Sequence, residues 1–202
     1  MPNYVHHTFE GGGIAIWHIT ETSDELYALL GMPCYDAQLL AKKNESRRAE
    51  WLAVRLLVKE LFGSECEVAY HPTGRPYLKN GVAHISISHT KGFAAVAYHH
   101  AAPIGMDIEY LSSRVERIAS RFTTPDEASY IDVHDEHARQ MYHLINWSAK
   151  EALYKLFDSP SLAEFKEVFH IAPYALAECG TMNATVCDVE NTILAVSYLT
   201  FP

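Results

Sequence analysis

Two carboxylates stand two residues apart in the apolar run Pro-Ile-Gly-Met-Asp-Ile-Glu-Tyr, residues 103–110. If residues 104–110 form a strand, Asp107 and Glu109 point to the same face, with their oxygens side by side. Two like charges at that distance repel each other unless a cation lies between them or one of them binds a proton. Mg²⁺ typically uses one or two carboxylates together with substrate phosphates, so the pair is a candidate metal site. The alternative is a strand end with two solvated acids.

A second set of charged residues lies about forty positions later, in the run Trp-Ser-Ala-Lys-Glu-Ala-Leu-Tyr-Lys over 147–155. Residues four apart share one face of a helix, so Trp147, Glu151 and Lys155 line up. An ordinary surface pair between Glu151 and Lys155 is one interpretation. The other is that Glu151 adds a third carboxylate while Lys150 and Lys155 hold phosphate oxygens, as in a Mg²⁺–pyrophosphate site.

Two further motifs could bind phosphate. Ser88 and His89 end an alternating strand, and they do not indicate a hydrolase pair, because neighbours on a strand point to opposite faces and no G-x-S-x-G elbow occurs. His89 is better suited as a donor to phosphate. Arg75 stands on a Gly-Arg-Pro turn, where it suits a phosphate or a stacked base. The sequence has neither a Walker loop nor a G-x-G-x-x-G motif, so the common nucleotide-binding folds are not indicated.

Composition restricts the classes of partner. The chain has 202 residues, 49% of them hydrophobic, and a net charge of −9. Residues 1–101 hold 9 basic and 10 acidic side chains, a net of −1, whereas residues 102–202 hold 7 and 15, a net of −8. Such an acidic chain is not expected to bind nucleic acid. One basic group on a predicted helical region is either a small phosphate-binding patch or a solvated helix face: Lys42, Lys43, Arg47, Arg48, Arg55 and Lys59.

The sequence also predicts a cytoplasmic protein. No apolar run approaches 18 residues, so we expect no membrane span. The first residues lack the basic start and apolar stretch of a signal peptide. The four cysteines are scattered, and we expect them to be free thiols.

The elements that must position these residues can be predicted from apolar periodicity. In the first half we expect a strand over 14–19, a short helix opened by a Thr22–Glu25 capping box, and a helical stretch over 36–62, bent or divided in two and ended by Gly63. Strands follow over 68–70, 85–88 and 93–98, the last two as a hairpin that turns at Lys91-Gly92.

In the second half we expect the strand over 104–110, a helix near 115–122, another that starts at Thr124-Pro125, and a long helix over 136–157 stopped by Ser159-Pro160. Strands are predicted near 164–171, 182–189 and 192–199, with a turn at Glu190-Asn191. Each half therefore combines helices with a small set of strands. This pattern is compatible with two similar α+β lobes, over 1–101 and 102–202.

Taken in order, the motifs resemble those of the 4′-phosphopantetheinyl transferases, of the longer type that modify carrier proteins of surfactin-like synthetases. The most specific part is G-x-D-I-E followed about forty residues later by W-x-x-K-E-x-x-x-K. The segments that carry the resemblance are Gly74-Arg75-Pro76, residues 87–90, residues 103–109, Arg121-Phe122 with Glu127, and residues 147–155. Arg55, in Val-Arg-Leu-Leu, extends it toward the N-terminus.

This resemblance implies two similar α+β lobes with small, mostly antiparallel sheets, packed as an intramolecular pseudo-dimer with coenzyme A in the cleft between them. It implies a monomer that transfers 4′-phosphopantetheine from coenzyme A to a serine of an apo acyl or peptidyl carrier protein, as a holo-acyl-carrier-protein synthase does. The reaction would need Mg²⁺ and release 3′,5′-ADP. Two alternatives are a non-catalytic module that binds coenzyme A or a carrier protein, and a Mg²⁺-dependent hydrolase of a nucleotide pyrophosphate.

The same resemblance implies roles for individual residues. Three carboxylates would hold Mg²⁺ against the pyrophosphate: Asp107, Glu109 and Glu151. Lys150 and Lys155 would contact phosphates. Four residues would bind the nucleotide end of coenzyme A, including its 3′-phosphate: Arg55, Arg75, Ser88 and His89. The catalytic residues would be Glu151, Glu127 and Lys155, with either Glu127 or Glu151 helping to deprotonate the incoming serine.

Overall fold

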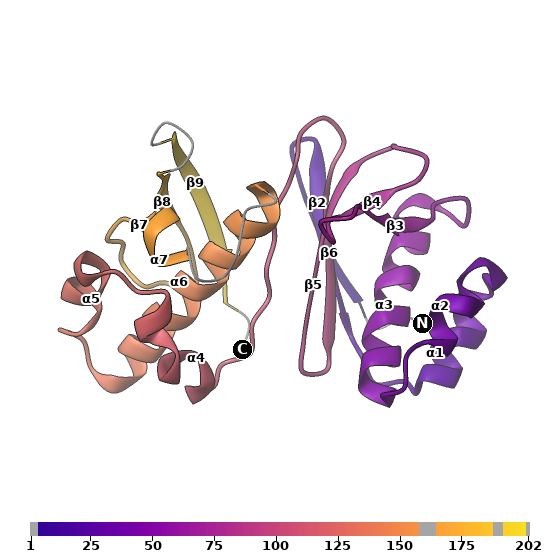
Figure 1. Ribbon diagram of the computed structural model, residues 1–202, viewed down its shortest axis with the longest axis horizontal. Helices are drawn as coiled ribbons and strands as arrows, with labels where there is room; N and C mark the ends of the chain where they lie inside the picture. The colour runs from indigo at the N-terminus through magenta and orange to yellow at the C-terminus, as the bar shows by residue number, and fades with distance from the viewer. Residues whose placement is uncertain (1–3, 158–164, 188–191, 201–202) are drawn as a thin grey trace. The chain divides into compact units, whose positions relative to one another are not determined.

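The computed structural model describes residues 4–157, 165–187 and 192–200. The chain divides into two compact units, Met1–Ile108 (unit 1) and Glu109–Pro202 (unit 2). Each unit combines helices with antiparallel strands, so the predicted α+β class is confirmed (Figure 1). The predicted lobes divide at residue 101, and the compact units divide at residue 108.

Unit 1 is built on a four-stranded antiparallel sheet with the order β1-β2-β6-β5. Its strands are β1 (Tyr4–Phe9), β2 (Gly12–His18), β5 (His84–Thr90) and β6 (Phe93–His99). The strands expected near 14–19, 85–88 and 93–98 and the β5–β6 hairpin are confirmed. The sequence did not predict β1, because it is an edge strand with five exposed positions and therefore no alternation of buried and exposed residues. Gly12 allows β2 to approach β6, since a Cβ there would come within 2.2 Å of the Tyr98 carbonyl oxygen.

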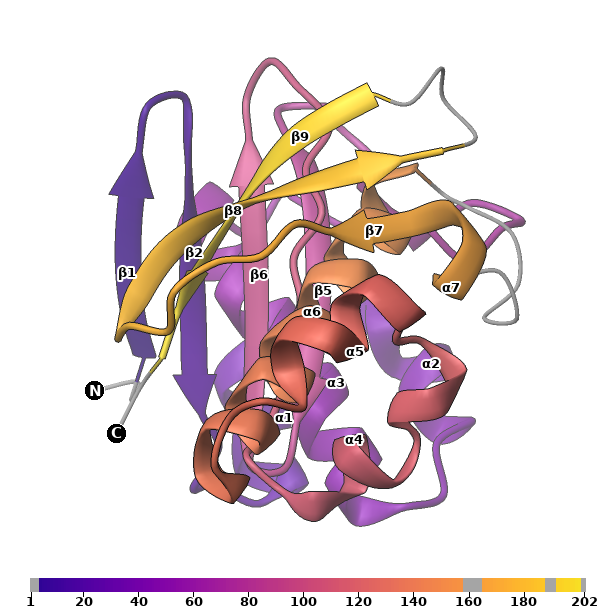
Figure 2. The same ribbon diagram turned by 90° about the vertical axis from the view of Figure 1, so that its left-hand side faces the viewer.

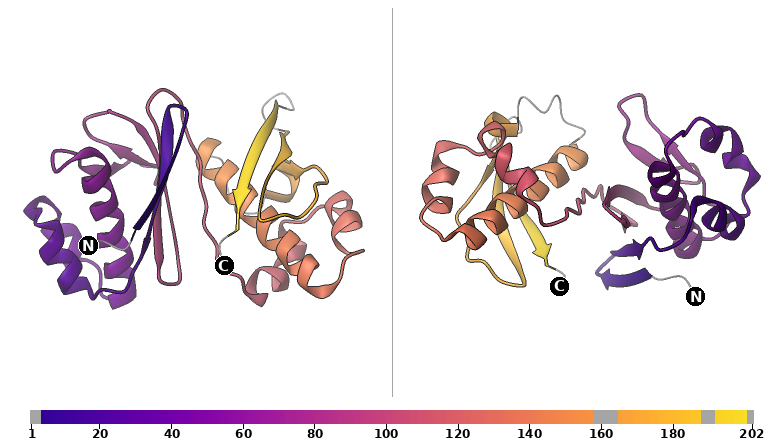
Figure 3. Two further views of the ribbon diagram at one scale, coloured as in Figure 1. Left: turned by 180° about the vertical axis from the view of Figure 1, so that it is seen from behind. Right: turned by 90° about the horizontal axis from the view of Figure 1, so that it is seen from below.

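Three helices lie on the same side of this sheet (Figures 1 and 3). They are α1 (Ser23–Leu30), α2 (Asp36–Leu40), which follows a 3₁₀ turn η1 (Pro33–Tyr35), and α3 (Glu45–Phe62). The predicted capping box is confirmed, because Thr22 Oγ1 accepts from Glu25 N and Glu25 Oε2 accepts from Thr22 N. The predicted division of the 36–62 stretch and its end at Gly63, where φ is 87°, are also confirmed.

The core of unit 1 lies between these helices and the sheet. Its fully buried side chains come from both layers and include Trp17, Leu26, Leu52, Leu57 and Val96. Two short strands, β3 (Val68–Tyr70) and β4 (Pro76–Leu78), form a separate two-stranded sheet joined by the turn that carries Arg75. The sequence predicted β3 but not β4.

The segment that carries Asp107 is not a strand, and this part of the prediction was wrong. Residues 103–110 are extended but join no sheet. Ile104, Met106 and Ile108 pack with Ala95 and Ala97, which alternate with the residues of β6 that face the helices. The segment therefore lies over the opposite face of the sheet, where the backbone of Met106 forms hydrogen bonds with the Ser86 hydroxyl.

Unit 2 contains a long central helix and a three-stranded antiparallel sheet with the order β7-β8-β9 (Figure 2). Its helices are α4 (Ser113–Arg117), the 3₁₀ turn η2 (Ala119–Arg121), α5 (Pro125–Ile131), α6 (Glu136–Phe157) and α7 (Phe165–Val168). Its strands are β7 (Phe169–Ile171), β8 (Cys179–Val186) and β9 (Thr192–Leu199). Helix α6 and the start of α5 at Thr124-Pro125 are as predicted.

Two predictions for unit 2 need correction. The helix expected over 115–122 is divided between α4 and η2. The strand expected over 164–171 begins only at Phe169, because Phe165–Val168 form one helical turn that buries its first and last residues. The predicted helix stop at Ser159-Pro160 and turn at Glu190-Asn191 lie outside the described residues.

The core of unit 2 packs α6 against the strands and the preceding helices. Phe122, Leu153, Phe165, Ala184 and Val186 are all buried there. The four cysteines, which all fall within the described ranges, are free thiols as expected. In the described part of the chain, no helix has the length and apolar character needed to cross a membrane.

Candidate active site

Two serines on β5 hold the segment that carries Asp107. Ser86 and Ser88 are two residues apart and so share one face of the strand. Ser86 Oγ accepts from Met106 N at 3.0 Å, and Ser88 Oγ donates to Asp107 Oδ1 at 2.7 Å. A serine hydroxyl has a single hydrogen, so Ser88 can only accept further hydrogen bonds while it orients Asp107. The predicted contact of Ser88 with the nucleotide end of coenzyme A stays a prediction.

His89 lies on the other face of β5, as predicted for neighbours on a strand. Its Nδ1 is 3.3 Å from Glu50 Oε2 and 3.4 Å from Arg47 Nη1, and both of these residues belong to α3. Arg47 Nη1 also donates to Glu50 Oε2 at 3.2 Å, and Ser46 Oγ donates to Glu50 Oε1 at 3.3 Å. Ser88 and His89 are therefore each held by a carboxylate, on opposite sides of the sheet.

Arg55 is enclosed by aromatic rings. Its side chain is only 2% exposed, and its Cζ lies 3.8 Å from the centre of the Trp51 ring, with Tyr35 and Tyr70 further out at 5.5 and 5.7 Å. It donates to the Tyr70 hydroxyl and to the Trp51 carbonyl oxygen. Burial lowers the pKa of this guanidinium because the charged form is desolvated. In the described structure these contacts all lie inside unit 1, and the predicted contact with coenzyme A stays a prediction.

The face of Trp51 brings two cations together. Lys42 Nζ lies 5.6 Å from the centre of the ring that Arg55 also contacts. The pKa of Lys42 is lowered, first by burial and then by repulsion from Arg55 and Arg47. Lys42 therefore lies within reach of the charges of Arg47, in the first turn of α3, and of Arg55, further along that helix, and an anion bound beside Lys42 would relieve the repulsion on it. This arrangement supports the interpretation of the basic group as a phosphate-binding patch.

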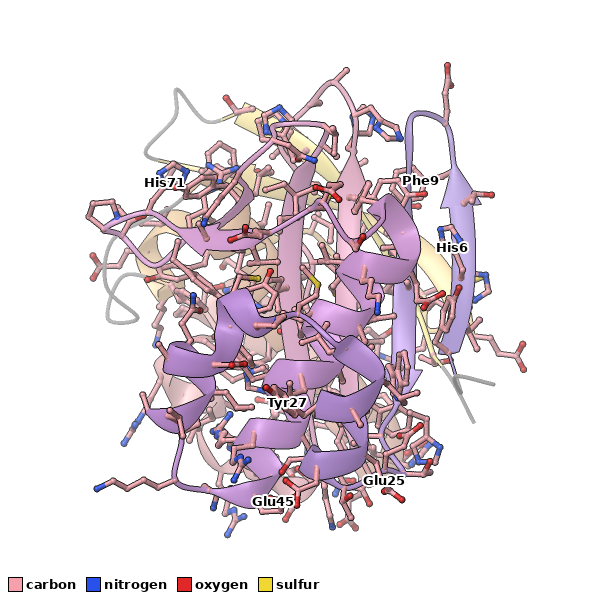
Figure 4. The ribbon with its side chains drawn as sticks, turned by 90° about the vertical axis from the view of Figure 1, so that its right-hand side faces the viewer. His6, Phe9, Glu25, Tyr27, Glu45 and His71 are labelled. Carbon is pink, nitrogen blue, oxygen red and sulfur yellow. The ribbon has the colours of Figure 1, made fainter. Side chains whose placement is uncertain are left out.

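Arg75 lines a cavity of about 380 Å³ within unit 1. The wall also includes His71, Tyr77, His84 and Pro103. The His71 and Tyr77 rings pack on each other with their centroids 4.4 Å apart and their planes tilted by 33°, so the wall of the cavity is aromatic beside the Arg75 guanidinium. Figure 4 shows that His71 lies at the end of unit 1 opposite to Glu25 and Glu45. An aromatic wall with an arginine can take a base and a phosphate together.

Glu127 and Lys150 form a buried pair inside unit 2. Lys150 is 0% exposed, and its Nζ donates to Glu127 Oε2 at 2.8 Å and to the Phe122 carbonyl oxygen at 2.6 Å. Glu127 Oε2 also accepts from Thr124 N, and its Oε1 accepts from Ile171 N, both at 2.8 Å. The pair therefore joins α5, α6 and β7. Burial lowers the pKa of Lys150, although the charge of Glu127 opposes the shift.

These contacts bear on two predicted roles. A carboxylate that already accepts from three nitrogen donors in a buried site is poorly placed to act as a base, because those bonds occupy its oxygens and block access to them. Likewise, an ammonium with no exposed surface must leave Glu127 before it can contact a phosphate. The roles predicted for Glu127 and Lys150 stay predictions.

The three predicted metal ligands are distributed over both units. Asp107 belongs to unit 1, and Glu109 and Glu151 belong to unit 2. All three are partly buried, and Glu109 Oε1 accepts from Tyr110 N at 3.0 Å. Across residues 4–157, 165–187 and 192–200, no group of three His, Cys, Asp or Glu side chains is placed to hold a metal ion. The three-carboxylate set stays a prediction, as does the role of Lys155, which lies with Glu151 on α6.

The motifs left three supporting residues unidentified. Ser86 and Ser88 are two positions apart, which is the spacing of residues on one face of a strand. Glu50 follows Arg47 by three positions, which is the spacing of neighbours on a helix. Periodicity could therefore have identified both Ser86 and Glu50. Tyr77 comes near His71 only because β3 and β4 pair. Sequence spacing gave no indication of that contact.

Comparison with known proteins agrees with the motifs. Residues 103–188 match the 4′-phosphopantetheinyl transferase superfamily. A curated relative, the 4′-phosphopantetheinyl transferase HetI of Nostoc sp. (strain PCC 7120 / SAG 25.82 / UTEX 2576), is 29% identical over 146 residues, which cover 64% of this chain. The match spans 61% of the length of that relative. The resemblance of this chain to the 4′-phosphopantetheinyl transferase superfamily is therefore confirmed.

Proposed function

We propose that this protein transfers 4′-phosphopantetheine from coenzyme A to a serine of an apo acyl or peptidyl carrier protein and releases 3′,5′-ADP. The observation that carries the proposal is the match over residues 103–188, because this range contains Asp107, Glu109, Glu151 and Lys155 in the predicted spacing. The contact between Ser88 and Asp107 adds support, since a functional carboxylate is expected to be held by a neighbouring donor.

The nucleotide end of coenzyme A fits the two basic regions of unit 1. The cavity at Arg75 supplies an aromatic wall and a guanidinium, and the start of α3 supplies further cations near His89. The nucleotide end of coenzyme A carries a diphosphate and a separate 3′-phosphate, so its negative charges lie at two separate places. We therefore assign Arg75 and His89 to its phosphates.

The chemistry of the donor set fits Mg²⁺. Asp107, Glu109 and Glu151 would supply hard carboxylate oxygens, the ligands that Mg²⁺ prefers. When bound, the ion would neutralise charge on the pyrophosphate leaving group. Lys155, one turn from Glu151 on α6, would bind phosphate oxygens as a point charge.

In the transfer step, the serine oxygen forms a bond to the phosphorus that carries pantetheine, and the bond from that phosphorus to the bridging oxygen breaks. The serine proton passes to a carboxylate, and 3′,5′-ADP leaves. Glu151 is the better candidate for the base, since Glu127 is 1% exposed and already accepts from three nitrogen donors. Positioning and electrostatics would account for most of the rate enhancement.

The test is incubation with coenzyme A, Mg²⁺ and a panel of apo carrier proteins, followed by intact-mass measurement of each carrier. We expect a phosphopantetheine mass gain with the wild-type protein. Asp107→Ala and Glu151→Ala should each lower the rate at least a hundredfold while retaining the wild-type circular dichroism spectrum. Glu136→Ala, which removes an exposed acid at the start of α6, is the matched control and should keep the wild-type rate.

The same assay separates the two alternatives. Release of 3′,5′-ADP from coenzyme A without any carrier would identify a hydrolase. Tight binding of coenzyme A in calorimetry, with no mass gain on any carrier, would identify a binding module. Either result from folded protein would overturn the proposed transfer, and full activity of Asp107→Ala or Glu151→Ala would overturn the metal assignment.

A further inference from the structure

Three residues of the cavity wall belong to one hairpin, which consists of β3, β4 and the turn between them: His71, Arg75 and Tyr77. The two strands form three residue pairs, and a two-stranded sheet of this size is marginally stable by itself. The turn is closed by hydrogen bonds from His71 N to the Arg75 carbonyl oxygen and from Gly74 N to the His71 carbonyl oxygen. The shape of the turn is therefore set locally, whereas its position depends on contacts with the rest of unit 1.

The two ends of the hairpin are held in different ways. At the end away from the turn, Val68 and Leu78 are each 2% exposed in the core, and Val68 N donates to the Tyr35 hydroxyl at 2.8 Å. At the end next to the turn, the hydroxyl of Tyr70 accepts from Arg55 Nη2 on α3 at 3.1 Å. Because Tyr70 directly precedes the turn, a shift of its ring would carry the turn with it.

Arg55 is itself fixed on α3. Its Cζ lies 3.8 Å from the centre of the Trp51 ring, and its Nη1 donates to the Trp51 carbonyl oxygen at 3.3 Å. A guanidinium carries its donors in a rigid plane, so Arg55 can bond to α3 and to Tyr70 at the same time. Within the described residues its Nε has no hydrogen-bond partner. A buried charge with an unsatisfied nitrogen is costly, and an apolar side chain of similar size would often be as stable at such a position.

We propose that Arg55 is a positioning residue that acts on coenzyme A through Tyr70, by holding the β3–β4 hairpin where its aromatic wall and Arg75 receive the nucleotide end. The proposal rests on the proposed function for the identity of the ligand. With its side chain 2% exposed, Arg55 could contact a phosphate directly only after the rings around it had moved. The positioning role requires no such movement.

The substitution Tyr70→Phe distinguishes the two roles, because it removes the acceptor and leaves the charge of Arg55 in place. If Arg55 positions the hairpin, Tyr70→Phe should raise the Kd for coenzyme A in calorimetry about tenfold, the usual effect of losing a hydrogen bond from a charged donor. The kcat for transfer should stay within about twofold of wild type, since the reacting groups are untouched. An unchanged or lower Kd would overturn the proposal, because a direct contact does not need the Tyr70 hydroxyl.

A double-mutant cycle tests whether the two residues act together. Arg55→Met should raise the Kd at least as much as Tyr70→Phe, and adding Tyr70→Phe to Arg55→Met should change it about twofold or less, because the contact is already lost. Additive effects would overturn the proposal. Tyr27→Phe is the matched control, since it removes a hydroxyl that donates to Asp36 and lies outside the cavity wall. This variant should keep the wild-type Kd.

The last arm needs neither ligand nor activity. Proton NMR of the Tyr77 ring reports its packing on His71, because an aromatic ring shifts the resonances of protons that lie close to its face. In Tyr70→Phe these resonances should move toward their unfolded positions, while the circular dichroism spectrum stays that of wild type. Unchanged Tyr77 resonances would overturn the proposal. A wild-type protein that binds no coenzyme A would refute the proposed function, and the resonances would still decide whether Arg55 positions the hairpin.

Discussion

At the scale of single residues, the two lysines of the W-x-x-K-E-x-x-x-K motif differ in environment. Lys150 has no exposed surface and is paired with Glu127, whereas Lys155 is partly exposed. A sequence motif cannot distinguish them, because burial depends on which face of α6 meets α5 and β7. The structure indicates that Lys150 supports the fold, and it leaves Lys155 as the better candidate for phosphate.

Removing each lysine tests this difference. Lys150→Ala leaves Glu127 buried without its cation, so we expect the free energy of unfolding to fall by about 3–5 kcal/mol. Lys155→Ala should cost far less stability but should lower the transfer rate. Urea denaturation followed by circular dichroism, beside the carrier mass assay, measures both effects. Equal losses of stability in the two variants would contradict the assignment.

At the scale of elements, helix ends and alternating strands could be predicted from sequence, because their signals are local. The capping box at Thr22, the start of α5 at Thr124-Pro125 and the end of α3 at Gly63 are of this kind. The 103–110 segment shows the limit. Apolar residues do alternate along this segment, but such a pattern shows only which side chains are buried. It does not show whether a neighbouring strand has a free edge with which the segment could pair. β1 was missed for the converse reason, since an exposed edge strand has no alternation to detect.

One contact between elements should depend on pH. Glu45, at the start of α3, accepts hydrogen bonds from the backbone N–H and the hydroxyl of Ser23 at the start of α1. These bonds lower the pKa of Glu45 below its ordinary value of 4.5. Because the folded pKa is the lower one, the stabilisation is present above pH 4.5 and is lost as the pH falls through the folded value.

The corresponding variant is Glu45→Gln, which cannot gain or lose that charge. We expect it to be less stable than wild type at pH 6, with the difference shrinking as the pH falls below 4.5. Urea denaturation at a series of pH values between 6 and 3 measures this. A difference that stays constant over the series would show that the ionised carboxylate is not what joins α1 to α3.

At the scale of the whole molecule, the charge is unevenly distributed. Most of the net charge of −9 comes from residues 102–202, whereas the cations that we assign to coenzyme A lie near α3 and Arg75. The acidic residues of this chain would therefore repel an acidic carrier protein, whereas its cations would attract coenzyme A. The distribution of charge could be counted from the sequence. The placement of Lys42 and Arg55 over the Trp51 ring could not, because it depends on the fold of α2 and α3.

Ionic strength should separate these two forces. With an acidic apo carrier and saturating coenzyme A, we expect the KM for the carrier to fall as salt rises from about 20 to about 200 mM, because screening weakens the repulsion. The KM for coenzyme A should rise over the same range, because its phosphates are attracted to the cations. A carrier KM that rises with salt would show instead that a basic surface dominates docking.

The serine contacts on β5 have a consequence for how this chain can change in length. Boundaries between compact units are usually the places where a protein accepts inserted residues. Here the boundary falls between Ile108 and Glu109, inside the G-x-D-I-E motif, and Ser86 and Ser88 fix the segment two residues before it. An inserted residue would shift Glu109 along the chain while Asp107 stayed bound to the sheet. The join between the two units is thus expected to be the part of the chain least able to vary in length.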